Sequence, residues 1–407
     1  MDELGPQHSP GGSVTPSSLA NRRGPSGVLV LLAGYAAFGM YWGVWVVIQL
    51  DFLRENHMSE GALGLLFSGL SVVSIATMTL LTPRIQQRPL AMTIAIGLIT
   101  MAGGGALIAI GAGPILLAGF VVLGVGNGLI DVFSNIAAQG VEARERRPVL
   151  QWLHASYSVG GIVGAIGAGA AIEAGVSFTT VMLVEMLALV AAATWTITSP
   201  RLRRLPRPAA AQSGFSLGVL RRAPRLLLPA LVIMFAFFVE GSMDVWSGTY
   251  VRKTLGSTAF VAGAAFAAFS LAIAVGRLTA GKLLFGLGYD RTILVSGAGA
   301  FVGGVIATLT SSPLVAAIGF LILGFFISAA APAAFGLADR TDQDPASAVA
   351  GMSTVGYTGF VIGPPIMGLL AESSGLRLTM GVIAMSTLGV AACGILDRLR
   401  HGASVRT

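Results

Sequence analysis

The sequence has few charged residues and a single cysteine. Charged residues make up 11% of the 407 positions, against about 25% in a soluble globular domain. Hydrophobic residues make up 54%, and the mean hydropathy is +0.81. This composition excludes an ordinary soluble domain and indicates a membrane protein. The lone Cys393 excludes an intrachain disulfide, and we interpret it as a small buried hydrophobe in the last apolar segment.

Other patterns are missing as well. The sequence has no series of short alternating segments of the kind an outer-membrane barrel requires, and no signal-peptide core precedes its first long apolar run. No metal-ligand cluster, nucleotide loop or nucleophile constellation stands out. GVGNGL at 124–129 has no strand before it, so we interpret it as helix packing. We therefore predict no metal site, no cofactor and no enzymatic activity.

Long apolar runs dominate what is present. A helix that crosses a bilayer needs about 20 consecutive apolar residues, and twelve runs meet this length. The 55 glycines suit close approach between such helices. We predict an all-α membrane protein with twelve transmembrane helices. The predicted spans are 28–50, 61–82, 90–111, 114–139, 150–172, 177–198, 226–249, 259–283, 292–310, 314–337, 348–370 and 378–397.

One basic, proline-containing segment divides the spans six and six. We predict a disordered cytoplasmic tail at 1–27, an N-terminal half at 28–198, a basic cytoplasmic linker at 199–225, a C-terminal half at 226–397 and a cytoplasmic tail at 398–407. The first tail is rich in proline, glycine and serine, a composition that cannot bury a core.

The basic residues predict the orientation. With the N-terminus in the cytoplasm, 21 of the 25 Lys and Arg residues fall on the cytoplasmic side, as the positive-inside rule requires. The other side keeps only Arg54, Arg252, Lys253 and Arg377. This bias places both termini in the cytoplasm and explains the net charge of +7 without a nucleic-acid partner.

The two halves repeat each other. GFVVLG at 119–124 matches GFLILG at 319–324, and Pro114 matches Pro313 at an offset of 199. Trp45 matches Trp246 at an offset of 201. The same offset of 199 relates Gly160, Gly164, Gly169 and Glu173 to Gly359, Gly363, Gly368 and Glu372. Duplicated six-span bundles are a plan of secondary transporters, with the substrate site between the halves near mid-membrane.

From about residue 28 to 397, the chain therefore resembles the major facilitator superfamily. More narrowly, it is similar to the bacterial inner-membrane group that includes YbjJ. The segments that carry this similarity are 126–142, 153–165, 240–251, 276–283 and 356–375. The resemblance implies alternating access by rocking of the two halves, in a multi-pass protein of the bacterial inner membrane.

Three departures from the resembled families stand out. The loop after the second span, LTPRIQQRPL, lacks the acidic residue of the superfamily motif, and Ile48 stands where the narrower group has an arginine. Gly164 is followed by Ala165 rather than by the proline of many drug antiporters, whereas Gly363 is followed by Pro364. The last departure argues against an antiporter.

A polar stripe marks the fourth span. Asn127, Asp131, Asn135 and Gln139 follow one another at intervals of four residues, which places them on one helix face. An ionisable group in hydrocarbon costs about 2.5–3.5 kcal/mol and usually faces protein or a water-filled cavity. Asp131, about 12 Å from the inner end of its span, is thus a candidate for proton coupling. The alternative is a structural carboxylate paired with a neighbouring helix.

Two further carboxylates lie one turn apart in the seventh span. Glu240 and Asp244 cannot both ionise at low cost, so one is expected to hold a proton. Pairing of Glu240 with an arginine is the alternative, and Arg277 in the eighth span is a candidate latch or structural residue. His154, near the inner end of the fifth span, can titrate near neutral pH and is the fourth proton-coupling candidate.

Aromatic and amide side chains suggest where a solute binds. Aromatic walls with a few polar groups suit a small organic ligand, although tryptophan and tyrosine near span ends are also common interface anchors. The candidates are Tyr35, Trp42, Gln49, Asn127, Asn135, Tyr157, Trp246 and Tyr357. Gly363 and Pro364 are candidate gating residues.

These features predict a proton-coupled secondary transporter of a small organic solute that acts as a monomer in the lipid bilayer. The alternatives are an exporter of a drug-like or secondary metabolite by proton antiport, and a membrane receptor that transports nothing. Import or export, and coupling to protons or sodium, stay open at this point. Carboxylates without a central arginine favour a neutral or cationic solute.

Overall fold

The computed structural model describes residues 27–404, except Arg201, residues 205–216 and residues 341–343. In this part of the chain, twelve helical segments are long and apolar enough to cross a membrane, and no strand forms. Each predicted run falls on one of these segments, so the predicted fold class is confirmed. The tail at 1–26, the end of the C-terminal tail and most of the linker lie outside the described residues.

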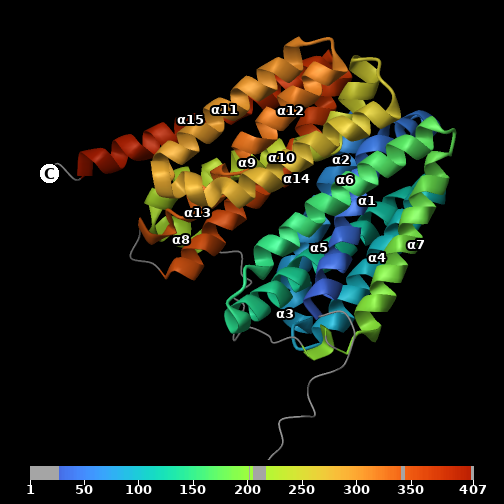
Figure 1. Ribbon diagram of the computed structural model, residues 1–407, viewed down its shortest axis with the longest axis horizontal. Helices are drawn as coiled ribbons and strands as arrows, with labels where there is room; N and C mark the ends of the chain where they lie inside the picture. The colour runs from blue at the N-terminus through green and yellow to red at the C-terminus, as the bar shows by residue number, and fades with distance from the viewer. Residues whose placement is uncertain (1–26, 201, 205–216, 341–343, 405–407) are drawn as a thin grey trace, which may run out of the picture.

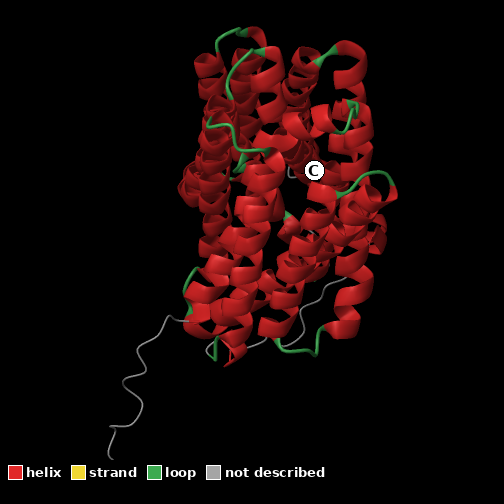
Figure 2. Cartoon of the chain, turned by 90° about the vertical axis from the view of Figure 1, so that its right-hand side faces the viewer, coloured by secondary structure: helices red, strands yellow, loops and turns green. Residues whose placement is uncertain are grey.

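Six spans precede the linker and six follow it. The first six are α1 (Gly27–Glu55), α2 (Glu60–Ala76) with its continuation α3 (Thr82–Ile85), α4 (Leu90–Ile110), α5 (Pro114–Glu145), α6 (Val149–Glu173) and α7 (Phe178–Thr198). After α8 (Leu217–Arg222) come α9 (Leu227–Thr249), α10 (Ala259–Leu287), α11 (Tyr289–Leu309), α12 (Pro313–Ile327) with α13 (Ala330–Phe335), α14 (Pro345–Ser374) and α15 (Leu376–Ser404). Figure 2 shows the spans as one bundle of helices.

Local signals fix where the spans begin and end. Ser59, Ser177 and Thr258 each accept a hydrogen bond from a backbone N–H in the first turn of α2, α7 and α10, which satisfies a donor that the helix leaves unpaired. Gly175 and Gly375 end α6 and α14 with φ of 85° and 83°, a conformation that glycine adopts without strain. Equivalent helices of the two halves thus end in the same way.

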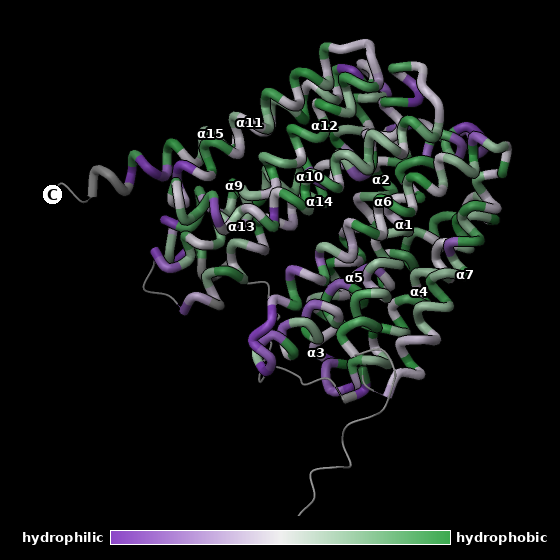
Figure 3. Tube along the Cα trace, viewed as in Figure 1, coloured by the Kyte–Doolittle hydropathy of each residue, from purple (hydrophilic) through white to green (hydrophobic). Residues whose placement is uncertain are grey.

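The halves also pack alike. In the N-terminal half, α1 packs along α6 and α4 along α5; in the C-terminal half, α9 packs along α14 and α11 along α12. Figure 3 shows hydrophobic residues along the spans and hydrophilic residues concentrated near their ends. The duplication inferred from sequence is therefore a duplication of helix packing.

The two halves meet at one end of the bundle and diverge at the other (Figure 1). We call the end that carries α3, α8 and α13 the linker end, and the opposite one the far end. Between the halves, α6 packs on α10 and α2 packs on α14. The halves are therefore closed against each other at the far end and separate toward the linker end.

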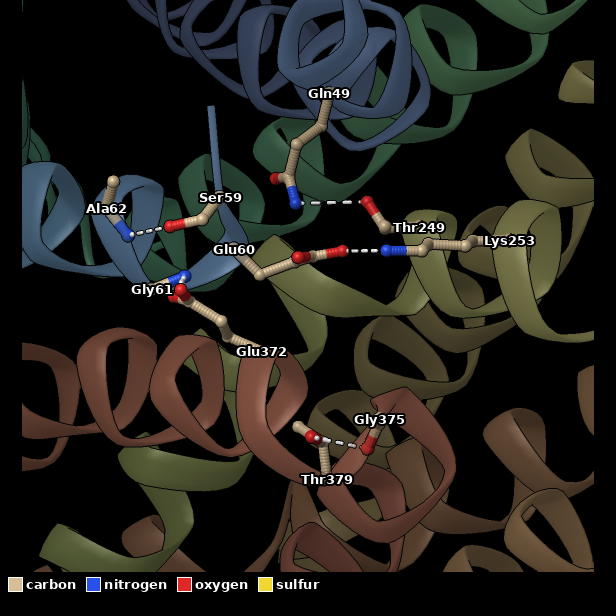
Figure 4. Close-up of polar contacts among 10 residues, drawn as sticks. All are labelled: Gln49, Ser59, Glu60, Gly61, Ala62, Thr249, Lys253, Glu372, Gly375 and Thr379. Atoms are coloured by element: carbon tan, nitrogen blue, oxygen red, sulfur yellow. Dashed lines mark hydrogen bonds and ion pairs between the residues drawn. The ribbon is translucent and has the colours of Figure 1, made fainter. Parts of the chain in front are cut away.

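Polar contacts join the halves at the far end. Arg252 forms a two-pronged ion pair with Asp51, with N···O distances of 2.6 and 3.0 Å, and Lys253 pairs with Glu60. Glu372 accepts a hydrogen bond from the Gly61 backbone N–H, at the first turn of α2, at 3.1 Å. Figure 4 shows the last two contacts side by side. Three helix pairs are thus tied together across the interface.

Candidate functional site

Asp131 lies in the middle of the longest helix. It is 17 residues from the start of α5 at Pro114 and 14 residues from its end at Glu145, or about 26 and 21 Å at 1.5 Å per residue. The helix continues six residues past the predicted span, so Asp131 lies deeper than the sequence indicated. Its carboxylate is part-buried rather than exposed to lipid.

Two donors hold this carboxylate. The Tyr35 hydroxyl of α1 donates to Asp131 Oδ1 at 2.8 Å, and the Asn135 amide donates to the same oxygen at 3.0 Å. Hydrogen bonds to a carboxylate are among the stronger ones in proteins. Asp131 is thus held by neutral groups, and no arginine pairs with it among the described residues. Its charge is left uncompensated.

Asn127, one turn earlier on the same stripe, has a different environment. Its amide donates to Ser74 Oγ of α2 at 3.2 Å, and Ser74 Oγ donates to the Gly124 carbonyl at 2.9 Å. This chain of bonds joins α2 to α5 within the N-terminal half. The polar stripe therefore divides into a packing contact at Asn127 and a carboxylate site at Asp131.

An aromatic group surrounds the Asp131 site. The Tyr35 ring lies 5.4 Å from Phe38, 5.9 Å from His154 and 5.8 Å from Tyr157, measured between ring centroids. Phe38 and Tyr157 are 5.3 Å apart. The structure thus brings Tyr35, His154 and Tyr157 together from α1 and α6, which pack along each other.

The C-terminal half supplies the other charges. Arg277 of α10 pairs with Glu240 of α9 at 2.7 Å, and their side chains are 33% and 13% exposed. Asp244, one turn after Glu240, has no hydrogen-bond or ion-pair partner among the described residues. Arg277 therefore balances the charge of Glu240, and Asp244 is the unpaired carboxylate. The pairing of Glu240 with an arginine is the alternative that the sequence had left open.

Two side chains of α6, Tyr157 and His154, connect the charges of the two halves. Tyr157 is within electrostatic range of Asp131 in its own half and of Asp244, Glu240 and Arg277 in the other half. His154 is within range of Arg277. We call these six residues, with Tyr35, Asn135 and Tyr357, the central cluster. All nine of its members, Arg277 included, are predicted site residues.

Tyr357 reaches the cluster from α14. It is within electrostatic range of Asp131, and its ring lies 5.8 Å from Phe237 of α9. Phe237 in turn stacks on Phe360 at 4.8 Å. The C-terminal half thus has an aromatic group of its own, and Tyr357 is the member of it that lies within electrostatic range of Asp131. Aromatic rings with a few polar groups are typical of small-ligand sites.

Besides Asn127, three predicted solute contacts lie elsewhere. Gln49 is fully buried at the far end, where it accepts from Trp45 and donates to Thr249 at 3.0 Å. Trp246 is also fully buried, and its indole N–H donates to the Pro364 carbonyl at 3.3 Å. Trp42 is half-buried and lies edge-on to Tyr41 within the N-terminal half. The structure places these residues outside the central cluster.

Sequence reasoning missed two aromatic members of this region. Phe38 is three residues after Tyr35 and four before Trp42, so its helical spacing could have placed it on the predicted face. Phe360 is three residues after Tyr357 and carries the same signal. Phenylalanine is so common in transmembrane helices that its type alone did not distinguish these two.

The ion pair between Arg277 and Glu240 predicts a stability effect. The Arg277→Met variant leaves Glu240 without its cation in a part-buried position, at a cost of about 1–3 kcal/mol. We expect the unfolding temperature of the purified protein to fall by several degrees. The Arg277→Met/Glu240→Gln double variant should recover most of this loss, and an equally unstable double variant would contradict the pairing.

The comparisons with known proteins decide the family. The model of the Major Facilitator Superfamily matches residues 30–343, which is most of the chain. The chain belongs to the major facilitator superfamily. The narrower likeness to the YbjJ group stays a prediction.

Relatives of this superfamily member carry corresponding names. It is 33% identical over 275 residues to an uncharacterized MFS-type transporter of Yersinia pestis, covering 67% of this chain and 69% of the relative. It is 28% identical over 309 residues to the membrane protein MosC of Rhizobium meliloti, covering 73% and 72%. It is 27% identical over 359 residues to the uncharacterized transporter y4wD of Sinorhizobium fredii, covering 87% and 93%.

Solved structures share the fold of this superfamily member. The nucleoside transporter NupG aligns over 92% of this chain and 99% of its own, with a TM-score of 0.74 and 11% identity. An inward-facing, unoccupied structure of a bacterial homolog to the human lysosomal transporter Spinster covers 91% and 96%, with a TM-score of 0.75 and 16% identity. A D-xylose-proton symporter covers 91% and 95%, with a TM-score of 0.69 and 15% identity. The chain is thus a membrane transporter by family and fold, and not an enzyme.

Proposed function

We propose that this transporter couples the movement of a small organic solute to protons by alternating access between its two halves. The observation that carries the proposal is the central cluster. Asp131, in the middle of α5, and Asp244, five residues before the end of α9, belong to opposite halves, and neither forms an ion pair among the described residues. A scaffold has no reason to keep such costly groups in a membrane. A transporter whose two halves rock around these carboxylates can use changes in their protonation to drive the movement of a solute.

The proposed site favours a neutral or cationic solute. Because Arg277 is already paired with Glu240, the cluster offers two carboxylates without an ion pair and no free guanidinium among the described residues. An anion would meet repulsion there. The hydroxyl or ammonium groups of such a solute would donate hydrogen bonds to the carboxylates. The rings of Tyr157 and Tyr357 would offer flat surfaces on which the rest of the solute could pack. The nucleoside transporter NupG and the D-xylose-proton symporter share the fold, and nucleosides and D-xylose are neutral solutes.

The proposed orientation places the linker end in the cytoplasm of a bacterial inner membrane. Basic residues concentrate there, and the positive-inside rule assigns such an end to the cytoplasm. The halves diverge at this end (Figure 1), so the proposed state is open to the cytoplasm. The solute would reach the central cluster from that side.

Proton-coupled flux tests the proposal. The purified protein is reconstituted into liposomes that contain a pH-sensitive dye, and D-xylose, nucleosides and small amines are added one at a time. We expect at least one of them to move protons with it, and its accumulation to collapse with a protonophore. Solute accumulation that is unchanged by the protonophore would refute proton coupling. Solute binding without any flux would favour the receptor alternative.

A further inference from the structure

Two consecutive prolines interrupt the hydrogen-bond ladder of α14. Pro364 and Pro365 lie inside this helix, and neither has a backbone N–H to donate. In an α-helix the N–H of residue i bonds to the carbonyl of residue i−4. The carbonyls of Phe360 and Val361 therefore lack their helical partners. In a membrane such groups must be satisfied by other protein groups or by water.

Two serines of the opposite half bond to these same two carbonyls. Ser68 Oγ of α2 donates to the Val361 carbonyl at 3.0 Å, and Ser71 Oγ donates to the Phe360 carbonyl at 3.4 Å. Their spacing of three residues places both hydroxyls on one face of α2, which packs on α14. The prolines thus create two acceptors, and the serines fill both.

The same stretch also brings the backbones close. A Cβ atom on Gly64 would lie 2.7 Å from the Pro364 carbonyl oxygen, so only glycine fits there without a shift. Trp246 bonds to that carbonyl from within the C-terminal half. A continuous contact therefore runs along α2 from Gly61, which meets Glu372, through Gly64 to Ser71.

We propose that Ser68 and Ser71, with the carbonyls freed by Pro364 and Pro365, form a latch that holds the far end closed. This inference rests on the alternating-access part of the proposed function. Opening the far end moves α2 away from α14, so both carbonyls lose their donors. Water entering from the far end then replaces the serine hydroxyls. In the closed state the two carbonyls are therefore bonded to serines and water is excluded from the interface; in the open state they are bonded to water.

Distance measurements between the halves test the latch without any solute. Spin labels are placed at Glu55→Cys in α1 and Ser373→Cys in α14, two exposed positions of the far end, in a Cys393→Ala background. The Ser68→Ala/Ser71→Ala variant should shift the distance distribution toward longer values. Interhelical hydrogen bonds in membranes are weak individually, so we expect the ratio of open to closed molecules to rise roughly five- to tenfold.

The prolines supply a decisive second comparison. In a Pro364→Ala/Pro365→Ala background both carbonyls regain helical donors, so removing the serines should cause little further shift. Thr358→Val is the matched control, because Thr358 Oγ1 donates to the Val355 carbonyl of its own helix and bonds to no other helix among the described residues. Size-exclusion profiles verify that each variant is folded, and Pro365→Ala alone isolates the Ser68 bond if the double replacement does not fold.

Two results would overturn the latch: an unchanged distance distribution in the serine variant, or an equal shift with and without the prolines. Both are independent of transport. A protein that shows the predicted shifts but no proton-coupled flux would retain the latch and lose the proposed coupling. Proton-coupled flux together with an unchanged distance distribution would retain the proposed coupling and exclude the latch.

Discussion

Replacing Asp131 with asparagine is expected to abolish gradient-driven accumulation of the solute while sparing counterflow exchange. Asparagine keeps the shape of the side chain and can still accept from Tyr35, but it cannot bind and release a proton. Exchange of solute for solute needs no net proton movement. Accumulation in proteoliposomes with an imposed pH gradient should therefore fall to the equilibrium level, with an exchange rate near that of the wild type.

Asp244→Asn is expected to behave in the same way, because Asp244 is the carboxylate of the C-terminal half that forms no ion pair among the described residues, whereas Glu240 is paired with Arg277. Asp290→Asn is the control. Asp290 pairs with Arg340 at 3.0 Å in the C-terminal half, outside the central cluster, and its loss should leave coupling intact. Wild-type accumulation in both Asp131→Asn and Asp244→Asn would refute the assignment of these carboxylates to coupling.

Gly160→Val is expected to prevent α1 from packing on α6. A Cβ atom at Gly160 would lie 1.9 Å from the Ala36 carbonyl oxygen, and one at Gly164 would lie 2.2 Å from the Met40 carbonyl oxygen. Small residues four apart let helix backbones approach this closely. Overpacking a tight contact costs about 1–3 kcal/mol and occasionally more. We expect a loss of monodisperse protein or a much lower unfolding temperature.

Gly167→Val is the matched control on the same helix. Nothing lies within 4 Å of a Cβ atom built at Gly167, so valine there meets open space on the outer face of α6. Its unfolding temperature should stay close to that of the wild type. Equal stability of the Gly160 and Gly167 variants, measured in the same detergent, would contradict the close approach of α1 and α6.

The sequence predicted the spans well and the site in part. The spans follow from local chemistry, since a run of about 20 apolar residues is stable in a bilayer wherever it lies in the fold. The four-residue spacing of the stripe likewise predicted that Asn127, Asp131 and Asn135 share a face. The same reasoning grouped Gln49 with Tyr35, although Gln49 lies at the far end, about 21 Å along the helix.

The ion-pair and hydrogen-bond partners of residues on different helices could not be predicted from the spacing of residues along the sequence. Glu240 and Asp244 are one turn apart, and from the sequence alone we expected one of them to hold a proton. The arginine that pairs with Glu240 is 37 residues away in α10, and only the packing of α9 against α10 brings it near. The serine bonds to Phe360 and Val361 join residues almost 300 positions apart and leave no local signal.

The sequence by itself determined a twelve-span membrane protein of two repeated halves, with acidic residues at mid-span. Hydrophobic length, the position of charge and helical periodicity are properties of each segment alone. The tertiary structure decided which end of the bundle is closed, which carboxylate has a cation and which carbonyls have donors. These depend on how helices from the two halves cross, and the crossing is set by contacts between residues far apart in the chain.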